Sequence, residues 1–336
     1  MTSREIIQRV LACDKPPRIG LTYSDYDGQP RINDTAGLSP TPDPDCDDST
    51  WSDDRGGTCW KDEWGCTWRR IEGKTQGGEV IDPPIKSWKD LETYKPPTLD
   101  DPARYERAAQ EAEKRRGQYQ LGGIAACSFN TSRYLRKMEE YLMDCAGDPE
   151  MVKRLNYMVS DIVLRQVDIY ADIGADGVFF CEDWGTQERL LVSPGMWQDV
   201  FRPTFERLVG RAHDRGLTVW MHSCGYVRDI IPDLVEIGVD VLQFDQPELH
   251  TFDFLARFAG QVTYWCPVDI QTTLQTGGRA LIRARAREMV EKLGSQGGGF
   301  IAKDYPDNMS IGLDPLWQHW GYEAFLEYGN YVHAEI

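Results

Sequence analysis

A histidine and a cysteine spaced two residues apart are the pair best suited to chemistry in this sequence. They are His222 and Cys224, at the end of the apolar run LTVWMHSCG, which has the composition of a buried strand. In a strand, residues i and i+2 point to the same side, so the imidazole and the thiol project together. Both are preferred ligands of Zn²⁺, and a catalytic zinc site takes about three protein ligands and keeps one position open. The pair predicts a metal site; a packed histidine beside a buried cysteine is the alternative.

Three further residues are candidates to complete this site. Cys266, in YWCPVD, ends the run two strands later, and barrels draw the inward side chains of one layer from alternate strands, so we predict it as the third ligand. A small buried thiol is the alternative for this residue. Glu182 and Asp183, in CEDWG, could complete the metal sphere or orient His222 through its second nitrogen. They could equally bind substrate or cap a helix.

The elements that position these residues follow a regular pattern from residue 118 onward. Short apolar runs alternate with helical stretches, which is typical of a parallel sheet with crossover helices. The runs lie at 120–127, 175–183, 217–224, 239–246, 261–269 and 298–305. A first strand over 18–27 brings the total to at least seven β units. A closed (β/α)8 barrel accommodates that number better than an open sheet, so an α/β fold of the TIM-barrel type is predicted.

Polar residues gather where these runs end, and the carboxyl ends of barrel strands are where active sites lie. We therefore expect one site at the barrel mouth. Its predicted catalytic residues are Glu182, Asp183 and Asp269. Its predicted substrate-binding residues are Trp184, Gln187, Gln246 and Tyr305.

The N-terminal third has a different character. Residues 28–57 are rich in Asp, Pro, Ser and Thr, and the runs 62–70 and 79–85 flank a Gly-rich turn, the pattern of a hairpin. Five of the eleven tryptophans fall within 51–88 and would form either a small aromatic core or a substrate-facing wall. We predict a single domain over 1–336, with an insertion at about 28–100 that covers the barrel mouth.

The amino-acid composition argues against several classes of protein. A net charge of −17, from 37 basic and 54 acidic residues, disfavours binding to nucleic acid or to an anionic membrane. No window approaches the ~20 apolar residues of a membrane span, and the first residues lack the apolar core of a signal peptide, so a cytoplasmic protein is expected. Nine scattered cysteines then predict free thiols or ligands rather than disulfides. No phosphate-binding loop, dinucleotide fingerprint or nucleophile elbow is present.

A family resemblance rests on three stretches: DPEMVKRLNYMVSD, GADGVFFCEDWG and LTVWMHSCGYVRDIIPDLVEIGVDVLQFDQPE. Over roughly 118–330, with the DEWGCTWRR segment, the chain resembles the uroporphyrinogen decarboxylase-like superfamily. It is similar in particular to the methyltransferase branch, which includes the methylcobalamin:coenzyme M methyltransferases. The resemblance implies a (β/α)8 barrel and a zinc held by the His-x-Cys-Gly signature, which His222 and Cys224 match.

Two departures from the family pattern bear on this reading. Family methyltransferases take their last thiolate from the eighth strand, but that strand reads FIAKDYPDN here, and Cys266 is the proposed substitute. The decarboxylases grip acidic porphyrins with N-terminal arginines, which the segment RIGLTYSDYD lacks. Porphyrinogen decarboxylation is therefore not expected.

The resulting hypothesis is a zinc-dependent methyltransferase of corrinoid-linked one-carbon metabolism. It would move a methyl group between a cobalamin and a small thiol or a methoxylated, for example aromatic, substrate. No DxHxxG motif is present, so the cobalamin would arrive on a corrinoid protein or as free cofactor. Barrels of this type often pair, which makes a homodimer an expectation. The alternatives are a metal-independent decarboxylase or lyase using Asp183, Asp269 and Tyr305, or a non-catalytic barrel that binds a small molecule.

Overall fold

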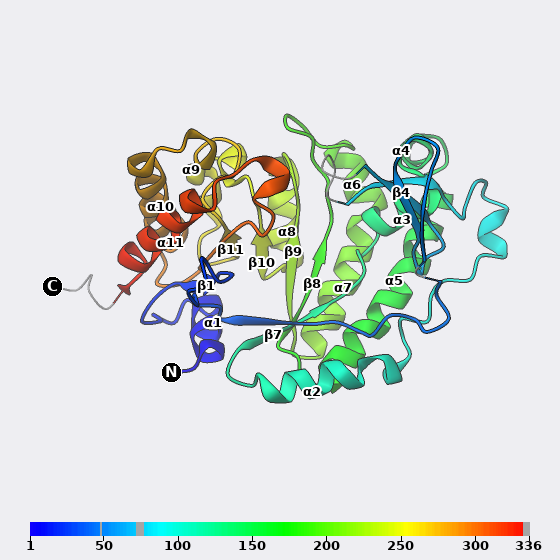
Figure 1. Ribbon diagram of the computed structural model, residues 1–336. Coiled ribbons are helices and arrows are strands. Elements are labelled where there is room, and N and C mark those ends of the chain that lie inside the picture. Colours follow the sequence, from blue (N-terminus) through cyan, green and yellow to red (C-terminus); the bar gives the residue numbers. More distant parts are fainter. Residues whose placement is uncertain (48, 72–76, 332–336) are drawn as a thin grey trace.

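The computed structural model describes residues 1–47, 49–71 and 77–331 (Figure 1). Its main sheet has eight strands, all paired in parallel through the order β1-β12-β11-β10-β9-β8-β7-β2. The strands are β1 (Gly20–Thr22), β2 (Thr35–Leu38), β7 (Tyr119–Gly123), β8 (Gly177–Cys181), β9 (Thr218–His222), β10 (Val241–Gln243), β11 (Thr263–Cys266) and β12 (Phe300–Lys303). The predicted (β/α)8 barrel is confirmed.

The two edge strands of the sheet, β1 and β2, meet where the barrel closes. In place of a parallel ladder between β1 and β2, one antiparallel bridge joins Thr22 of β1 to Asn33, two residues before β2. Beside it, the buried carboxylate of Asp34 accepts the Leu21 N–H at 2.8 Å and pairs with the Arg18 guanidinium at 2.7 Å. This arrangement leaves the sheet a nearly closed barrel.

Helices surround the barrel (Figure 1). They are α1 (Ser3–Leu11), α2 (Glu106–Lys114), α3 (Phe129–Arg136), α4 (Met138–Gly147), α5 (Pro149–Asp172), α6 (Pro194–Val200), α7 (Arg202–Asp214), α8 (Ile231–Ile237), α9 (Phe252–Leu255), α10 (Arg279–Leu293) and α11 (Pro315–Tyr328). At the start of α6, Pro194 takes the first helical position and the Ser193 hydroxyl caps the helix by accepting the Met196 N–H at 3.2 Å. Within the described part of the chain, no helix has the length and apolar composition needed to cross a membrane.

Alternate residues of each strand face opposite cores. The barrel interior is filled by large side chains such as Tyr119, Trp220 and Ile301, and Ile7 and Val10 of α1 pack into its lower end. The other residues of the strands, such as Tyr264 and Cys266, pack outward against the surrounding helices. Side chains beyond this filled interior, at the carboxyl ends of the strands, are the ones free to form a site.

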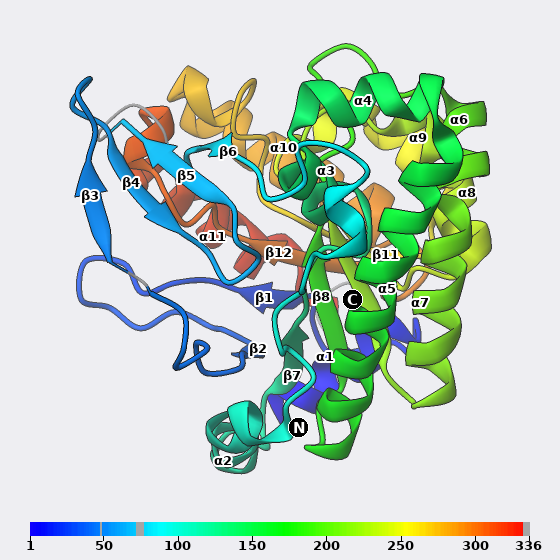
Figure 2. The same ribbon diagram turned by 90° about the vertical axis from the view of Figure 1, so that its right-hand side faces the viewer.

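A second sheet lies beside the barrel (Figure 2). It consists of the antiparallel strands β3 (Thr50–Ser52), β4 (Thr58–Lys61), β5 (Thr67–Arg70) and β6 (Glu79–Asp82), of which β5 and β6 are the runs expected to form a hairpin. The sequence prediction failed for β2, because Thr35–Leu38 lies inside the predicted insertion of 28–100 but pairs with β7 in the barrel. Its residues, TAGL, carry no branched apolar run to mark a core strand.

The buried His250 gives the fold a predicted acid sensitivity. Its ring packs 4.5 Å from the Phe244 ring, and neither ring nitrogen has a hydrogen-bond partner among the described residues. Burial, with a smaller effect from Arg228, lowers the pKa of His250 from 6.5 to about 4. The folded state therefore favours the neutral ring. The contribution of His250 to the free energy of unfolding is fully present above pH ~6.5 and is lost as the pH falls toward ~4.

We expect His250→Phe to remove this part of the pH dependence. By linkage, the wild type should lose up to about 3 kcal/mol of unfolding free energy between pH 7 and pH 4 through this group alone. The variant keeps a ring against Phe244 and has no nitrogen to protonate. Urea titrations of both proteins across this range measure the difference, and parallel pH curves would refute the assignment.

Candidate metal centre

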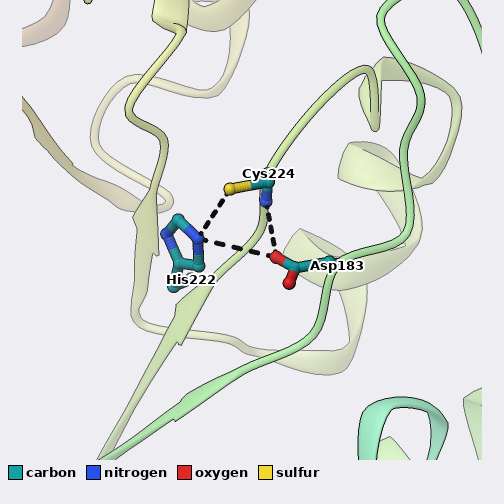
Figure 3. Close-up of side chains that lie close together, drawn as sticks. All are labelled: Asp183, His222 and Cys224. Carbon is teal, nitrogen blue, oxygen red and sulfur yellow. Dashed lines mark hydrogen bonds and ion pairs between the residues drawn. The ribbon is translucent and has the colours of Figure 1, made fainter. Parts of the chain in front are cut away.

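Three adjacent strands carry the candidate site. His222, the last residue of β9, is in register with Cys181 at the end of β8 and with Gln243 at the end of β10. The alternation continues past the strand ends, so Asp183 and Cys224 project on the same side as Cys181 and His222. The three side chains of Asp183, His222 and Cys224 thus converge at the barrel mouth (Figure 3).

The ligand atoms of Asp183, His222 and Cys224 lie within 4.8 Å of one another. His222 Nε2 is 3.1 Å from Cys224 Sγ and 3.6 Å from Asp183 Oδ1. Asp183 Oδ1 also accepts the backbone N–H of Cys224 at 3.0 Å, which fixes the carboxylate beside the thiol. Across residues 1–47, 49–71 and 77–331, this is the one group of three His, Cys, Asp or Glu side chains placed to hold a metal ion.

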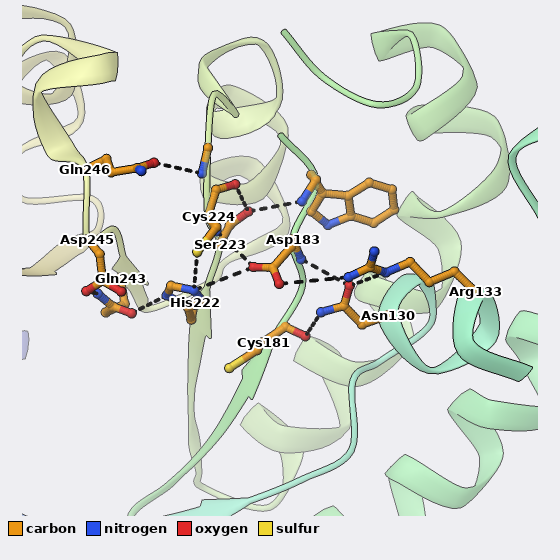
Figure 4. A network of polar contacts seen from close by, with 12 residues as sticks. Asn130, Arg133, Cys181, Asp183, His222, Ser223, Cys224, Gln243, Asp245 and Gln246 are labelled. Carbon is orange, nitrogen blue, oxygen red and sulfur yellow. Dashed lines mark hydrogen bonds and ion pairs between the residues drawn. The ribbon is translucent and has the colours of Figure 1, made fainter. Parts of the chain in front are cut away.

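A chain of hydrogen bonds sets the tautomer of His222, and Figure 4 shows its part from Asp245 through Gln243 to His222. Lys303 Nζ donates to Asp245 Oδ1 at 2.9 Å, and Gln243 Nε2 donates to the same carboxylate oxygen at 2.7 Å. Gln243 therefore turns its carbonyl oxygen toward His222 Nδ1, and a carbonyl only accepts. The proton of the neutral ring lies on Nδ1, which leaves the lone pair of Nε2 facing Cys224 and Asp183.

The charges around Cys224 would favour a bound cation. Burial, then the nearby carboxylates of Asp183 and Asp245 and the thiol of Cys181, raise the pKa of the Cys224 thiol well above its usual range. Burial alone would raise the pKa of Asp245 too, but the Lys303 ammonium, with His222, outweighs it and holds that pKa below the usual value. A divalent cation has the opposite effect on a coordinating thiol: it lowers the pKa of the thiol so far that the thiol loses its proton. The nitrogen, sulfur and oxygen donors here are the set that zinc takes.

The glycine of the His-x-Cys-Gly sequence is required by a close backbone approach. Gly225 has a φ of 74°, and a Cβ there would collide with the backbone of Gly185 and Thr186. Its N–H donates to the side-chain oxygen of Gln246 at 3.2 Å. Gln246, predicted to bind substrate, thus holds the loop that carries Cys224.

Glu182 faces away from the mouth and caps a helix. Its carboxylate is fully buried and accepts the backbone N–H groups of Ser128, Phe129 and Asn130, at 2.8, 3.2 and 2.7 Å, where α3 begins. Burial raises the pKa of Glu182 to about 7, against the opposing effect of these hydrogen bonds. Of the alternatives for this residue, helix capping is the one that its contacts support.

The structure does not bring Cys266 or Asp269 to the metal centre. Trp265 faces the mouth, so the next residue, Cys266, points outward and is fully buried against the helices. Asp269 is buried beyond the end of β11, where its carboxylate accepts the N–H groups of Glu248, Gln271 and Thr272. Asp183, and not Cys266, is the third side chain beside His222 and Cys224. Asp269 holds its loop.

The remaining predicted substrate residues divide between the mouth and other places. Tyr305 lines a mouth cavity of about 470 Å³ together with His222 and Cys224. Trp184 is buried behind the site, with its ring stacked on Phe129 at 4.1 Å, and Gln187 lies exposed on the following loop. Neither contributes to the described mouth cavity.

Four residues at the site were given no role in the sequence prediction. Cys181, Gln243, Asp245 and Lys303 all line the mouth cavity. Three of them, Cys181, Gln243 and Lys303, are the last residues of their strands. They could have been identified from the sequence by asking which residue at the end of each predicted strand points inward. Behind Asp183, Asn130 of α3 accepts the Asp183 N–H at 3.4 Å and the Arg133 Nε–H at 2.8 Å (Figure 4).

Comparison with known proteins agrees with the fold and identifies the family. In structure, the chain is similar to a methyltransferase from Methanosarcina mazei, with a TM-score of 0.60 and 17% identity over 79% of this chain and 76% of that one. An L-ribulose 3-epimerase gives a TM-score of 0.44 and 13% identity over 70% and 86%. No curated protein sequence matches the chain. A family model described as uroporphyrinogen decarboxylase (URO-D) matches residues 62–303, which is well over half of the sequence, so the chain belongs to this enzyme family.

Proposed function

We propose that the protein is a zinc-dependent methyltransferase that moves a methyl group between a corrinoid and a small thiol or methoxylated substrate. The observation that carries the proposal is the convergence of Asp183, His222 and Cys224 at the mouth of a barrel of the URO-D family. The similarity in fold to a protein described as a methyltransferase supports the reaction class.

The three side chains would hold one Zn²⁺ and leave a position for substrate, as catalytic zinc sites do. When bound, the ion would lower the pKa of a thiol or polarise a methoxy oxygen. His222 would bind through Nε2, because Gln243 holds the opposite nitrogen. Tyr305 and Lys303, which also line the mouth cavity, would contact the substrate.

The corrinoid would come from outside the chain, on a partner protein or free. Transfer to a thiol breaks the carbon–cobalt bond with its electron pair left on cobalt, forms the S–CH₃ bond and releases the thiol proton. Demethylation of an ether runs in the opposite sense: a Co(I) corrinoid supplies the electron pair, and the leaving oxygen takes a proton. Both directions balance without a further oxidant or reductant.

A metal-independent lyase is less compatible with these contacts. It would use Asp269 beside Asp183, yet the Asp269 carboxylate accepts the backbone N–H groups of Gln271 and Thr272 in its own loop and of Glu248 in the loop after β10. Such a carboxylate is a loop anchor rather than a proton carrier.

Zinc dependence of methyl transfer tests the proposal. Metal-free and zinc-loaded protein should be mixed with methylcobalamin and 2-mercaptoethanol, and separately with Co(I) cobalamin and 2-methoxyphenol, while the visible spectrum of the cobalamin is followed. We expect zinc to accelerate one of these reactions by more than ~100-fold, the effect of several kcal/mol of charge stabilisation. His222→Ala should stay at the metal-free rate. Equal rates with and without zinc, or no turnover in either direction, would contradict the proposal.

A further inference from the structure

A second cavity adjoins the metal centre. It has a volume of about 420 Å³ and lies between the carboxyl ends of β7 and β8 and the small sheet, which contributes β5 and the turn that precedes it. Phe179 and Cys181 line both this cavity and the mouth cavity that holds His222 and Cys224. A molecule with its body in the second cavity would therefore have one end near the metal centre.

The walls of this cavity are apolar and differ from one another. Trp64 and Trp68 of the small sheet, with Tyr134 of α3, give one side aromatic rings, and Trp68 and Tyr134 meet edge to face at 4.7 Å. The segment 123–126 also lines the cavity; its sequence is Gly-Ile-Ala-Ala, and three of these four residues have side chains no larger than a methyl group. Aromatic rings together with a stretch of small side chains favour a flat guest.

Two polar side chains of the cavity, Asp62 and Asn130, are already engaged in hydrogen bonds. Asp62 accepts the Trp68 indole N–H at 2.6 Å and the Cys66 backbone N–H at 2.8 Å, one on each carboxylate oxygen. Asn130 donates to the Cys181 carbonyl at 3.0 Å and accepts from Arg133 and Asp183. Both oxygens of the Asp62 carboxylate are thus satisfied by N–H donors, which leaves little attraction for a cation, and a carboxylate there opposes an anion. The cavity suits a neutral guest.

We propose that this aromatic cavity (Trp64, Trp68, Gly123, Ala126, Tyr134) binds the ring of a neutral methoxylated arene, with the methoxy group directed past Cys181 to the metal centre. An apolar cavity of about 150 Å³ is enough for benzene, so the space here accepts a substituted ring. This inference rests on the proposed function and selects its demethylating direction. The aryl O–CH₃ bond breaks with its electron pair left on oxygen, which takes a proton from solvent. The methyl carbon bonds to the cobalt of a Co(I) corrinoid, which supplies the electron pair.

Binding of methoxybenzene, measured by calorimetry on the whole protein, tests the inference without turnover. Trp64→Ala removes part of the ring wall and Ala126→Leu adds bulk to the stretch of small side chains, so we expect each to weaken binding at least tenfold. Trp51→Ala is the matched control, because Trp51 lies half exposed on β3, outside the cavity, and should leave affinity unchanged. His222→Ala should still bind the arene, since the ring site does not need the metal.

The outcomes separate this inference from the proposed function. Arene binding that is lost in both cavity variants and kept in Trp51→Ala supports the ring site, whatever the result of the methyl-transfer assay. Absence of arene binding, or equal affinity in all variants, overturns it, even if zinc-dependent transfer to a thiol is observed. Stronger binding of tetramethylammonium than of methoxybenzene also overturns it, because an aromatic cage for a cation would then be the better description.

Discussion

Asp183→Ala should weaken zinc binding by more than ~100-fold, whereas Cys266→Ser should leave it unchanged. Removal of a ligand is expected to exceed the ~10–100-fold that loss of a supporting partner typically costs. The carboxylate of Asp183 lies 3.6 Å from His222 Nε2 and is held there by the Cys224 N–H. Cys266, the ligand favoured by the sequence, is buried on the outer face of the sheet.

A competition titration with a chromophoric zinc chelator measures both affinities. Circular dichroism and a urea titration should accompany it, since a hydroxyl at the fully buried position of Cys266 can lower stability without touching the metal. The reverse pattern, in which Cys266→Ser loses zinc and Asp183→Ala retains it, would show that β11 contributes the ligand and that this description of the site is wrong.

Gln243→Leu should lower zinc affinity by ~10–100-fold although Gln243 is not itself a ligand. The leucine side chain cannot accept the proton of His222 Nδ1 or donate to Asp245, so the ring loses its fixed orientation and tautomer.

The matched control is Gln120→Leu, the same substitution at a buried glutamine near the opposite end of β7. Its side chain donates to the Gln118 carbonyl at 3.2 Å, away from the metal centre. We expect this variant to lose some stability and no zinc affinity. An equal loss of zinc affinity in both variants would mean that Gln243 acts only through general stability.

The barrel could be predicted from sequence because its strands are apolar runs with regular spacing. β2 was not predicted, because Thr35–Leu38 contains Gly and Ala in place of branched apolar residues. It becomes a strand only by pairing with β7. Its pairing partner lies more than 80 residues away in the sequence. A contact of that range leaves no local signal.

The part of the site that depends on neighbouring residues was predicted correctly. The part that depends on which residues of a strand face the barrel interior was missed. His222 and Cys224 share a side because they are two residues apart. The choice between Trp265 and Cys266 as the inward residue of β11 depends on which face of the strand turns to the barrel, and both types are compatible with either face. Glu182 and Asp183 are adjacent in an extended segment, so their side chains point to opposite sides. Glu182 contacts the start of α3, and Asp183 lies beside His222 and Cys224.

The zinc content of the purified protein tests the central claim most directly. Elemental analysis should be made on the wild type and on His222→Ala and Cys224→Ala, each shown to be folded by circular dichroism. The account predicts close to one zinc per wild-type chain, after reconstitution if necessary, and almost none in either variant. A wild type that takes up no zinc, or variants that keep it, would contradict the assignment of Asp183, His222 and Cys224 as a metal centre.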